Sequence, residues 1–250
     1  MNVSYLDDMI PSMKQQINNR VESLLVKFRM EECTFHSQEK GTTEEIVEDT
    51  PLVISLTTHG KRIETVFHTI ESIFQQTLKA NRVILWLGDK EFSCVEELPL
   101  SLRIQMERGL DIRFVKDVRS YTKLIPALKE FPNANIVTID DDFMYPRNLL
   151  EGFAGVLYPP GVFDDEVLNE QKFLQLAPHA DDIWFTAMAI KAKTPIVQIK
   201  RNFGVYHEMY QDDDVQDIAL ANTNVSENKN DVQLKAVFDE YNLYSLLNES

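Results

Sequence analysis

Three consecutive aspartates end an apolar run in the stretch ANIVTIDDDFMYP, residues 134–146. Each charge in the triplet raises the cost of ionising the next, so Asp140, Asp141 and Asp142 need either water or a positive partner. Hard divalent cations such as Mg²⁺ and Mn²⁺ take carboxylate oxygens as ligands. Alternate residues of an extended chain face the same way, which predicts that Asp140 and Asp142 share one side while Asp141 turns away. A solvated turn is the alternative interpretation.

A second acidic pair lies in HADDIWF, residues 179–185. Apolar residues follow it at helical spacing, namely Ile183, Trp184, Met188 and Ile190. We therefore expect Asp181 and Asp182 in the first turn of an amphipathic helix, where the helix dipole favours acidic side chains. The pair could simply cap that helix.

Strand and helix patterns alternate between residues 51 and 142. The apolar, strand-like runs are PLVISLTT, RVILWLGD, DIRFVKD and ANIVTIDDD. Amphipathic helical segments separate them, namely KRIETVFHTIESIFQQ, LPLSLRIQMERG and TKLIPALKEF. This alternation is typical of β-α-β units in an α/β fold with a mostly parallel central sheet and flanking helices. We expect PIVQI, residues 195–199, to be the last core strand.

Polar residues follow each expected strand. In doubly wound sheets, ligands bind beyond the carboxyl ends of the strands. The residues that this rule brings to one edge are Thr57 and Thr58 after the first strand, Asp89 after the second, Asp117 after the third and Asp140 to Asp142 after the fourth. The sequence therefore predicts a ligand site at that edge.

The formal charge of −15 lies mainly in the flanking segments. Residues 31–50 carry seven acids and one lysine, and residues 208–250 carry ten acids and two lysines, whereas 51–207 is nearly neutral. We expect a helix from Tyr5 to Met30 with an acidic linker over 31–50, a folded domain over 51–207, and an acidic loop over 208–250 with a closing helix that packs on the core. The first helix is an appendage that could carry a partner protein or an oligomer contact.

Composition excludes several classes of protein. Clustered Lys and Arg, which an extended nucleic-acid interface needs, do not occur. No run of about 18 apolar residues occurs, and the beginning MNVSYLDDMIPSMKQQ lacks a secretory pattern. We therefore expect a cytoplasmic protein, at most peripheral to a membrane.

The order of several blocks resembles bacterial glycosyltransferases of the GT-A fold, which use nucleotide sugars in polysaccharide and glycoconjugate synthesis. These blocks are PLVISLTTHGKRIETVFHTIESIFQQTLKANRVILWL, KDVRSYTKLIPALKEFPNANIVTIDDDFMYP, GVLYPPGVF and APHADDIWFTAMAIKAKTP. The resemblance covers about residues 51–200. It implies a GT-A-like (Rossmann-like) fold, a UDP-sugar donor, a glycan or glycoconjugate acceptor, and Mn²⁺ or Mg²⁺.

The same resemblance implies roles for single residues. On the donor side they are Thr57 near the nucleotide base, Asp89 on the base or ribose, Tyr121 over the base, Lys123 at the diphosphate, and Asp140 and Asp141. The implied metal ligands are Asp142, Asp140 and, as a late histidine, His207. For Thr57, Asp89 and Lys123, an ordinary capping or surface role is an equal alternative, and for His207 a surface histidine is the favoured alternative.

On the acceptor side, the resemblance implies that Asp182 is the general base and that Asp181 binds or orients the acceptor. Direct displacement with such a base would invert the anomeric centre. Only 38 residues, 143–180, separate the triple aspartate from Asp181, fewer than expected for this family. A catalytically impaired relative that binds sugar nucleotide or serves a partner enzyme is therefore the alternative. A carboxylate-metal phosphotransferase is a third class, although its nucleophilic aspartate is missing after the first strand.

Overall fold

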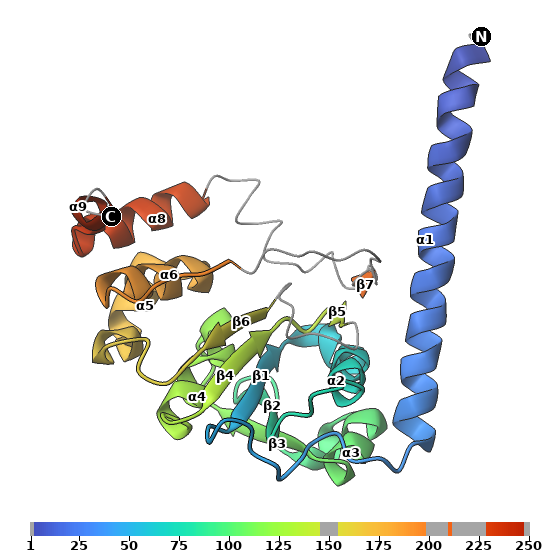
Figure 1. The fold of residues 1–250 in the computed structure, drawn as a ribbon, viewed down its shortest axis with the longest axis horizontal. Helices are drawn as coiled ribbons and strands as arrows, with labels where there is room; N and C mark the ends of the chain where they lie inside the picture. The colour runs from blue at the N-terminus through green and yellow to red at the C-terminus, as the bar shows by residue number, and fades with distance from the viewer. Residues whose placement is uncertain (1–2, 146–154, 199–209, 212–228, 248–250) are drawn as a thin grey trace.

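The protein is described by a computed structural model that covers residues 3–145, 155–198, 210–211 and 229–247 (Figure 1). Its centre is a five-stranded sheet with the order β3-β2-β1-β4-β6, beside a two-stranded sheet of β5 and β7. The strands are β1 (Leu52–Thr58), β2 (Arg82–Gly88), β3 (Leu110–Val115), β4 (Asn135–Ile139), β5 (Phe143–Met144), β6 (Gly155–Tyr158) and β7 (Tyr210–Gln211).

The central sheet is mostly parallel, which confirms the predicted α/β class. Strand β1 pairs in parallel with β2 and with β4, and β2 pairs in parallel with β3. Strand β6 is antiparallel to β4 at the edge. Continuous apolar runs fill the inner strands because helices cover both faces of a parallel sheet. The architecture is compatible with a Rossmann-like arrangement.

One predicted strand is wrong. Residues 195–198, the described part of PIVQI, form no strand, and the edge position of the central sheet belongs to β6 instead. The side chains of Ile196 and Val197 are exposed. An apolar run becomes a strand only when a sheet edge is within reach, and β6 already occupies the edge beside β4.

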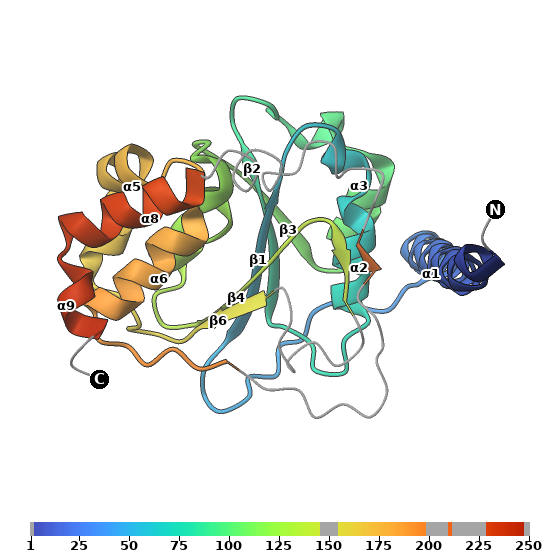
Figure 2. The same cartoon turned by 90° about the horizontal axis from the view of Figure 1, so that it is seen from above.

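Helices cover both faces of the sheet (Figure 2). The α-helices are α1 (Val3–His36), α2 (Val66–Phe74), α3 (Leu100–Glu107), α4 (Ile125–Glu130), α5 (Glu170–Leu176), α6 (Asp181–Lys191), α8 (Lys229–Glu240) and α9 (Leu243–Leu247). Short 3₁₀ helices add η1 (Gly60–Glu64), η2 (Val95–Glu97), η3 (Arg119–Lys123) and η5 (Asp165–Leu168). Helices α2 and α3 cover one face, and α4, α5, α6, α8 and α9 lie on the other.

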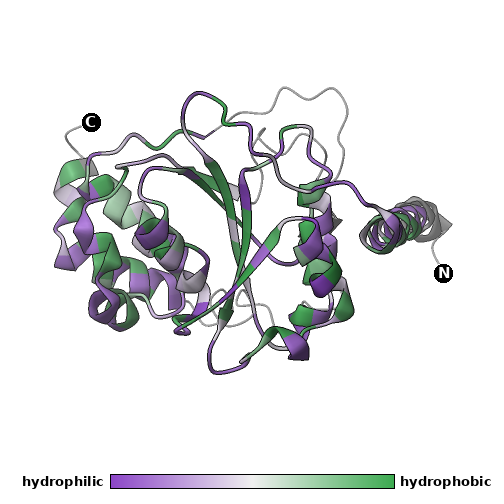
Figure 3. Cartoon of the chain, turned by 90° about the horizontal axis from the view of Figure 1, so that it is seen from below, coloured by the Kyte–Doolittle hydropathy of each residue, from purple (hydrophilic) through white to green (hydrophobic). Residues whose placement is uncertain are grey.

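Two apolar cores result, one on each face of the sheet. Apolar strands run between the two helical layers in Figure 3. The side chains of Leu56 and Leu85 belong to the core under α2 and α3, whereas Trp86 belongs to the core under α6. The apolar residues of the predicted amphipathic segment KRIETVFHTIESIFQQ are all buried: Ile63, Val66, Phe67, Ile70, Ile73 and Phe74.

The amino-terminal helix α1 is longer than predicted. It continues to His36, so the first six residues of the expected acidic linker are helical. The rest of that segment packs on the domain, since Gly41 is buried and Thr42 forms a parallel bridge with Ala80. Asn81 also donates to the backbone oxygens of Thr43 and Glu45, so residues 37–45, which we call the strap, lie against the domain. The amino-terminal half of α1 projects away from the other elements (Figure 1).

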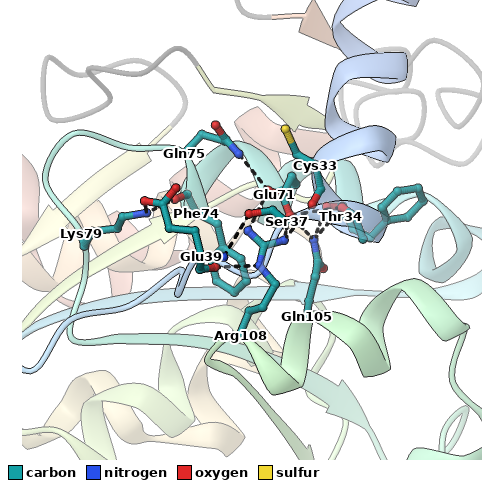
Figure 4. Close-up of polar contacts among 11 residues, drawn as sticks. Cys33, Thr34, Ser37, Glu39, Glu71, Phe74, Gln75, Lys79, Gln105 and Arg108 are labelled. Carbon is teal, nitrogen blue, oxygen red and sulfur yellow. Dashed lines mark hydrogen bonds and ion pairs between the residues drawn. The ribbon is translucent and has the colours of Figure 1, made fainter.

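A buried ion cluster joins the end of α1 to the domain (Figure 4). The carboxylate of Glu71 in α2 is fully buried and accepts hydrogen bonds from Arg108 Nη1 at 2.7 Å and Nη2 at 3.1 Å. The Thr34 hydroxyl of α1 also donates to Glu71, at 3.2 Å. Arg108 in turn donates to the backbone oxygens of Cys33 and Glu39. We call these residues the Glu71–Arg108 cluster.

The chain closes with two helices on the same face as α6. Helices α8 and α9 contact α6, with Val237, Phe238 and Leu243 buried in the core there. The structure therefore has two helices, Lys229–Glu240 and Leu243–Leu247, where the sequence pattern predicts one closing helix. Within the described residues, no helix is long and apolar enough to cross a bilayer.

Candidate functional site

The carboxyl ends of β1 and β4 lie side by side in the sheet. The chain runs outward from β1 through β2 to β3 and then returns to β4 on the other side of β1, so the strand order reverses between β1 and β4. Such a topological switch point opens a crevice beyond the strand ends, which is where α/β proteins bind ligands. Thr58 ends β1, and the aspartate triplet follows Ile139, the last residue of β4.

Arg62 is the positive partner of two of the three aspartates. Its Nη1 atom donates to Asp141 Oδ1 at 2.5 Å, and its Nη2 atom lies 3.4 Å from Asp142 Oδ2. The Thr58 hydroxyl donates to the other Asp141 oxygen at 2.6 Å. All four residues are buried. Burial raises the pKa of Asp141, while the guanidinium and the hydroxyl act in the opposite direction.

The predicted alternation of the three aspartates is therefore wrong. Strand β4 ends at Ile139, and Asp141 and Asp142 lie in a turn, so the two-residue period stops before the triplet. Asp141 and Asp142 share Arg62, and Asp140 faces elsewhere. Asp141, which we expected on the donor side, is 7% exposed and occupied by Arg62 and Thr58.

Lys123 joins the triplet to the second acidic pair. Its ammonium lies 3.3 Å from Asp140 Oδ1 and 3.2 Å from Asp181 Oδ2. Burial acts to lower the pKa of Lys123, but the carboxylates of Asp181, Asp140 and Asp182 outweigh it and raise the pKa. The lysine is therefore charged at neutral pH. We call Asp140, Lys123, Asp181 and Asp182 the strand-end cluster.

The acidic pair begins α6, as predicted. Asp181 is buried against Lys123, whereas Asp182 is exposed. Desolvation of the Asp182 carboxyl group by the surrounding protein raises its pKa. The charges of Asp181 and Asp140 raise the pKa further, while the charge of Lys123 lowers it. Asp182 is thus a carboxylate that meets solvent and holds a proton more strongly than an ordinary aspartate, which suits a general base.

Two further predicted donor residues lie at the same edge of the sheet. The Thr57 hydroxyl donates to the Trp86 backbone oxygen at 2.8 Å. The carboxylate of Asp89 is exposed and accepts the backbone N–H of Asp117 at 3.2 Å. Asp89 therefore stabilises the loop after β3 and keeps access to solvent.

Tyr121 does not occupy the predicted place. Its side chain is fully buried, its ring stacks on Phe173 with centroids 4.1 Å apart, and its hydroxyl donates to the Ala177 backbone oxygen at 2.6 Å. The ring therefore belongs to the core between η3 and α5 and does not cover a ligand base. Sequence polarity alone does not separate a buried tyrosine from a stacking one, because its ring is apolar and its hydroxyl needs only one partner.

Two of the three predicted metal ligands, Asp140 and Asp142, are not grouped into a metal site among the described residues. His207 lies outside the described residues. Within the described part of the chain, no three His, Cys, Asp or Glu side chains are grouped to hold a metal ion. The carboxylate of Asp142 faces Arg62 while that of Asp140 faces Lys123, so in this arrangement the two do not fit a shared ion.

Sequence reasoning missed Arg62, which decides where two aspartates point. A signal was present, since Arg62 follows the strand that lies beside β4. Tyr145 was also missed; its hydroxyl accepts the backbone N–H of Asp140 at 3.0 Å and holds the start of the triplet. Tyr145 follows the triplet closely in the sequence and is buried.

The fold and the site together define an α/β protein with a mostly parallel sheet and a charged cluster at its carboxyl edge. A scan against models of known protein families gives no match, and a search of curated proteins also gives none.

Proposed function

We propose that the protein is a glycosyltransferase of the GT-A type, which moves a sugar from a UDP-sugar to a hydroxyl group of a glycan or glycoconjugate. The main support is that Asp140, Lys123, Asp181 and Asp182 meet at the switch point of the sheet, although they come from three separate segments. In such a cluster, the ammonium can stabilise the negative charge of a leaving diphosphate, and a carboxylate with a raised pKa can accept the proton of an attacking hydroxyl.

In the proposed reaction, Asp182 accepts the proton of the acceptor hydroxyl while that oxygen attacks the anomeric carbon. The bond from the anomeric carbon to the diphosphate oxygen breaks, and the nucleoside diphosphate leaves with the electron pair. The charged Lys123 ammonium stabilises the developing negative charge. Asp181 holds Lys123 and the start of α6 in place, and Thr57 and Asp89 flank the donor. One direct displacement inverts the anomeric centre.

Dependence on Mn²⁺ or Mg²⁺ remains a prediction. Asp140 has a side chain that is 45% exposed, and it could contribute one oxygen ligand. Asp142 could contribute a second oxygen only if Arg62 moved away from it. The proposed steps therefore use the residues of the chain alone.

The second candidate is a catalytically impaired relative of these glycosyltransferases that only binds sugar nucleotide. It is supported by Arg62, which neutralises two of the three aspartates, and by Tyr121, whose ring lies in the core. Such a protein would hold sugar nucleotide without transfer. A phosphotransferase has less support, since β1 ends in Thr57 and Thr58 rather than in an aspartate.

The two candidates separate in a pair of measurements. Thermal unfolding with UDP-, GDP-, dTDP- and CMP-sugars, each with Mn²⁺ or with EDTA, tests donor binding, because a ligand of the native state raises its stability. Release of free nucleotide, with and without glycan acceptors, tests transfer. If none of the sugar nucleotides raised the unfolding temperature, both candidates would be refuted. Stabilisation without any nucleotide release would favour the binding-only protein.

A further inference from the structure

The outward face of α1 carries apolar side chains that no described residue covers. Ile17, Val21, Leu24, Leu25 and Phe28 are each between 49% and 63% exposed. Single exposed apolar residues are ordinary, but a continuous stripe of them marks an interaction surface. We call these five residues the α1 stripe.

The opposite face of α1 holds the helix to the domain. Ser23, Met30 and Thr34 are buried, and α1 contacts α2 and α3. At 3.6 residues per turn, the α1 stripe lies about 140° around the helix from these buried residues. Helix α1 forms one side of the molecule, with its amino-terminal half away from the sheet (Figures 1 and 2). A second molecule can therefore reach the stripe without displacing the domain.

The spacing of the stripe is that of a coiled coil. Ile17, Val21, Leu24 and Phe28 are separated by four, three and four residues. This is the alternation of the a and d positions of a heptad, with Val21 and Phe28 at a and Ile17 and Leu24 at d. A β-branched residue at a with leucine at d, as in Val21 and Leu24, favours two strands in parallel.

We propose that α1 pairs with α1 of a second copy of this chain as a short parallel coiled coil. In that pairing a g position faces the e position of the next heptad on the other helix, so Lys27 meets Glu32 of the second copy, twice by symmetry. An antiparallel pair would bring the g positions together. It would place Lys27 near Arg20 of the second copy, and two like charges would repel.

Charges beside the stripe also argue against a lipid surface as the occupant. Membrane-binding helices present a basic polar face next to their apolar face. The g and e positions that border the α1 stripe instead carry both signs, namely Arg20 and Lys27 with Glu32. Mixed charges suit a protein partner with the same mixture, and a second copy supplies it.

Pairing would also account for the length of α1. An isolated helix gains little stability from its own hydrogen bonds and depends on the packing of an apolar face. The α1 stripe lies in the middle part of this 34-residue helix, and its side chains stay about half or more exposed among the described residues. A second copy would provide that packing.

The first test is the mass of the full chain in solution over a series of concentrations, measured by sedimentation. The expected result is a concentration-dependent dimer, twice the monomer mass of 28.9 kDa. Val21→Glu, which buries a charge in the seam, is expected to weaken the dimer on the order of a hundredfold. Arg29→Gln, an exposed change off the stripe, is the matched control and should leave the dimer unchanged. A wild-type protein that stays monomeric up to its solubility limit overturns the proposal.

The second test concerns orientation. Lys27→Glu and Glu32→Lys should each weaken the dimer, and the double exchange should restore most of the affinity. Failure of the double exchange to recover affinity overturns the parallel register.

Flotation of the wild type with vesicles of phosphatidylglycerol and phosphatidylcholine is the third measurement. A monomer that binds these vesicles through the stripe, with binding lost in Val21→Glu, overturns the dimer in favour of a membrane surface.

Discussion

Two buried groups of charges in this protein differ in how completely they are paired. In the Glu71–Arg108 cluster, one carboxylate meets one guanidinium through two hydrogen bonds, and Thr34, Gln75 and Gln105 donate further bonds to the same oxygens. Every acceptor of Glu71 is thereby used. Such a satisfied network fixes one arrangement of the elements that it joins.

The carboxyl edge of the sheet is not balanced in this way. Among the residues that the structure describes, five carboxylates, Asp140, Asp141, Asp142, Asp181 and Asp182, surround two cations, Arg62 and Lys123. Asp140 and Asp182 also reach solvent. Surplus charge with access to water is costly for folding alone, and perturbed groups of this kind gather at functional sites. We infer that the first cluster serves stability and the second serves a ligand.

The largest expected effect is on transfer. Asp182→Asn removes the proposed base, so sugar transfer should fall about 10²–10⁴-fold while donor affinity stays nearly constant. Nucleotide release and calorimetric titration of the donor measure the two quantities. Asp239→Asn, an exposed aspartate on α8 paired with Lys235, is the control. Normal turnover by a folded Asp182→Asn protein would refute the assignment, and an equal loss of stability and activity would favour the helix-cap interpretation.

The Glu71–Arg108 cluster should show the reverse behaviour. Arg108→Met leaves the fully buried Glu71 carboxylate without its cation, which should lower the free energy of unfolding by about 3–5 kcal/mol. Urea denaturation measures this loss. Arg113→Met removes a partly exposed arginine that pairs with Asp111 and Glu130, and should cost only about 0–1 kcal/mol. Similar losses in both variants would remove the distinction between the clusters.

A smaller effect is expected at Asp142. If Asp142 is the partner of Arg62, its substitution lowers stability, whereas if it is a metal ligand, its substitution abolishes metal-dependent donor binding. Asp142→Asn weakens the contact with Arg62, and we expect a loss of about 1–3 kcal/mol. Asp140→Asn, at a half-exposed carboxylate, should cost less than about 1 kcal/mol. If instead Asp142→Asn has the stability of the wild type and loses a Mn²⁺-dependent gain in donor affinity, Asp142 is a metal ligand and its ion pair with Arg62 does not stabilise the protein.

The smallest expected change is in the pH profile of transfer. Asp182 must lose its proton to act as a base, so the rate should rise with pH through a pKa above 3.8, the ordinary value for aspartate. Removing the Asp140 charge in Asp140→Asn takes away one cause of the raised pKa and should move the midpoint to lower pH. The Asp239→Asn control should not move it. An unchanged midpoint in Asp140→Asn would show that the strand-end cluster does not set the proton affinity of Asp182.

Local pattern predicted the scaffold of this site well. The alternation of apolar runs and amphipathic segments gave the mostly parallel sheet, and helical spacing gave the buried face of α2 from Val66 to Phe74. The acidic start of α6 also followed from the apolar residues after it. These features depend on neighbours within one or two turns of the chain, which the sequence displays directly.

Contacts between distant segments were not predictable in the same way. Arg62 lies 79 residues before Asp141, and Tyr121 lies 56 residues before the backbone oxygen that accepts its hydroxyl. A charge or a hydroxyl can be satisfied by many partners, and sequence spacing does not choose among them. The direction of the aspartates also depended on where β4 ends, and element ends are the least certain part of a sequence prediction.

Gly41 has a consequence for where an autonomous folding unit of this chain can begin. A Cβ atom at residue 41 would lie 2.0 Å from Phe74 Cδ1, and the Gly41 backbone N–H donates to the Arg108 oxygen at 2.8 Å. The strap therefore lies directly on the Phe74 ring, with the Arg108 guanidinium 5.3 Å from the ring centre. A truncation that started at Pro51 would uncover this ring and take the Thr34 hydroxyl away from Glu71. A shortened protein intended for expression should therefore keep the chain from Cys33 onward.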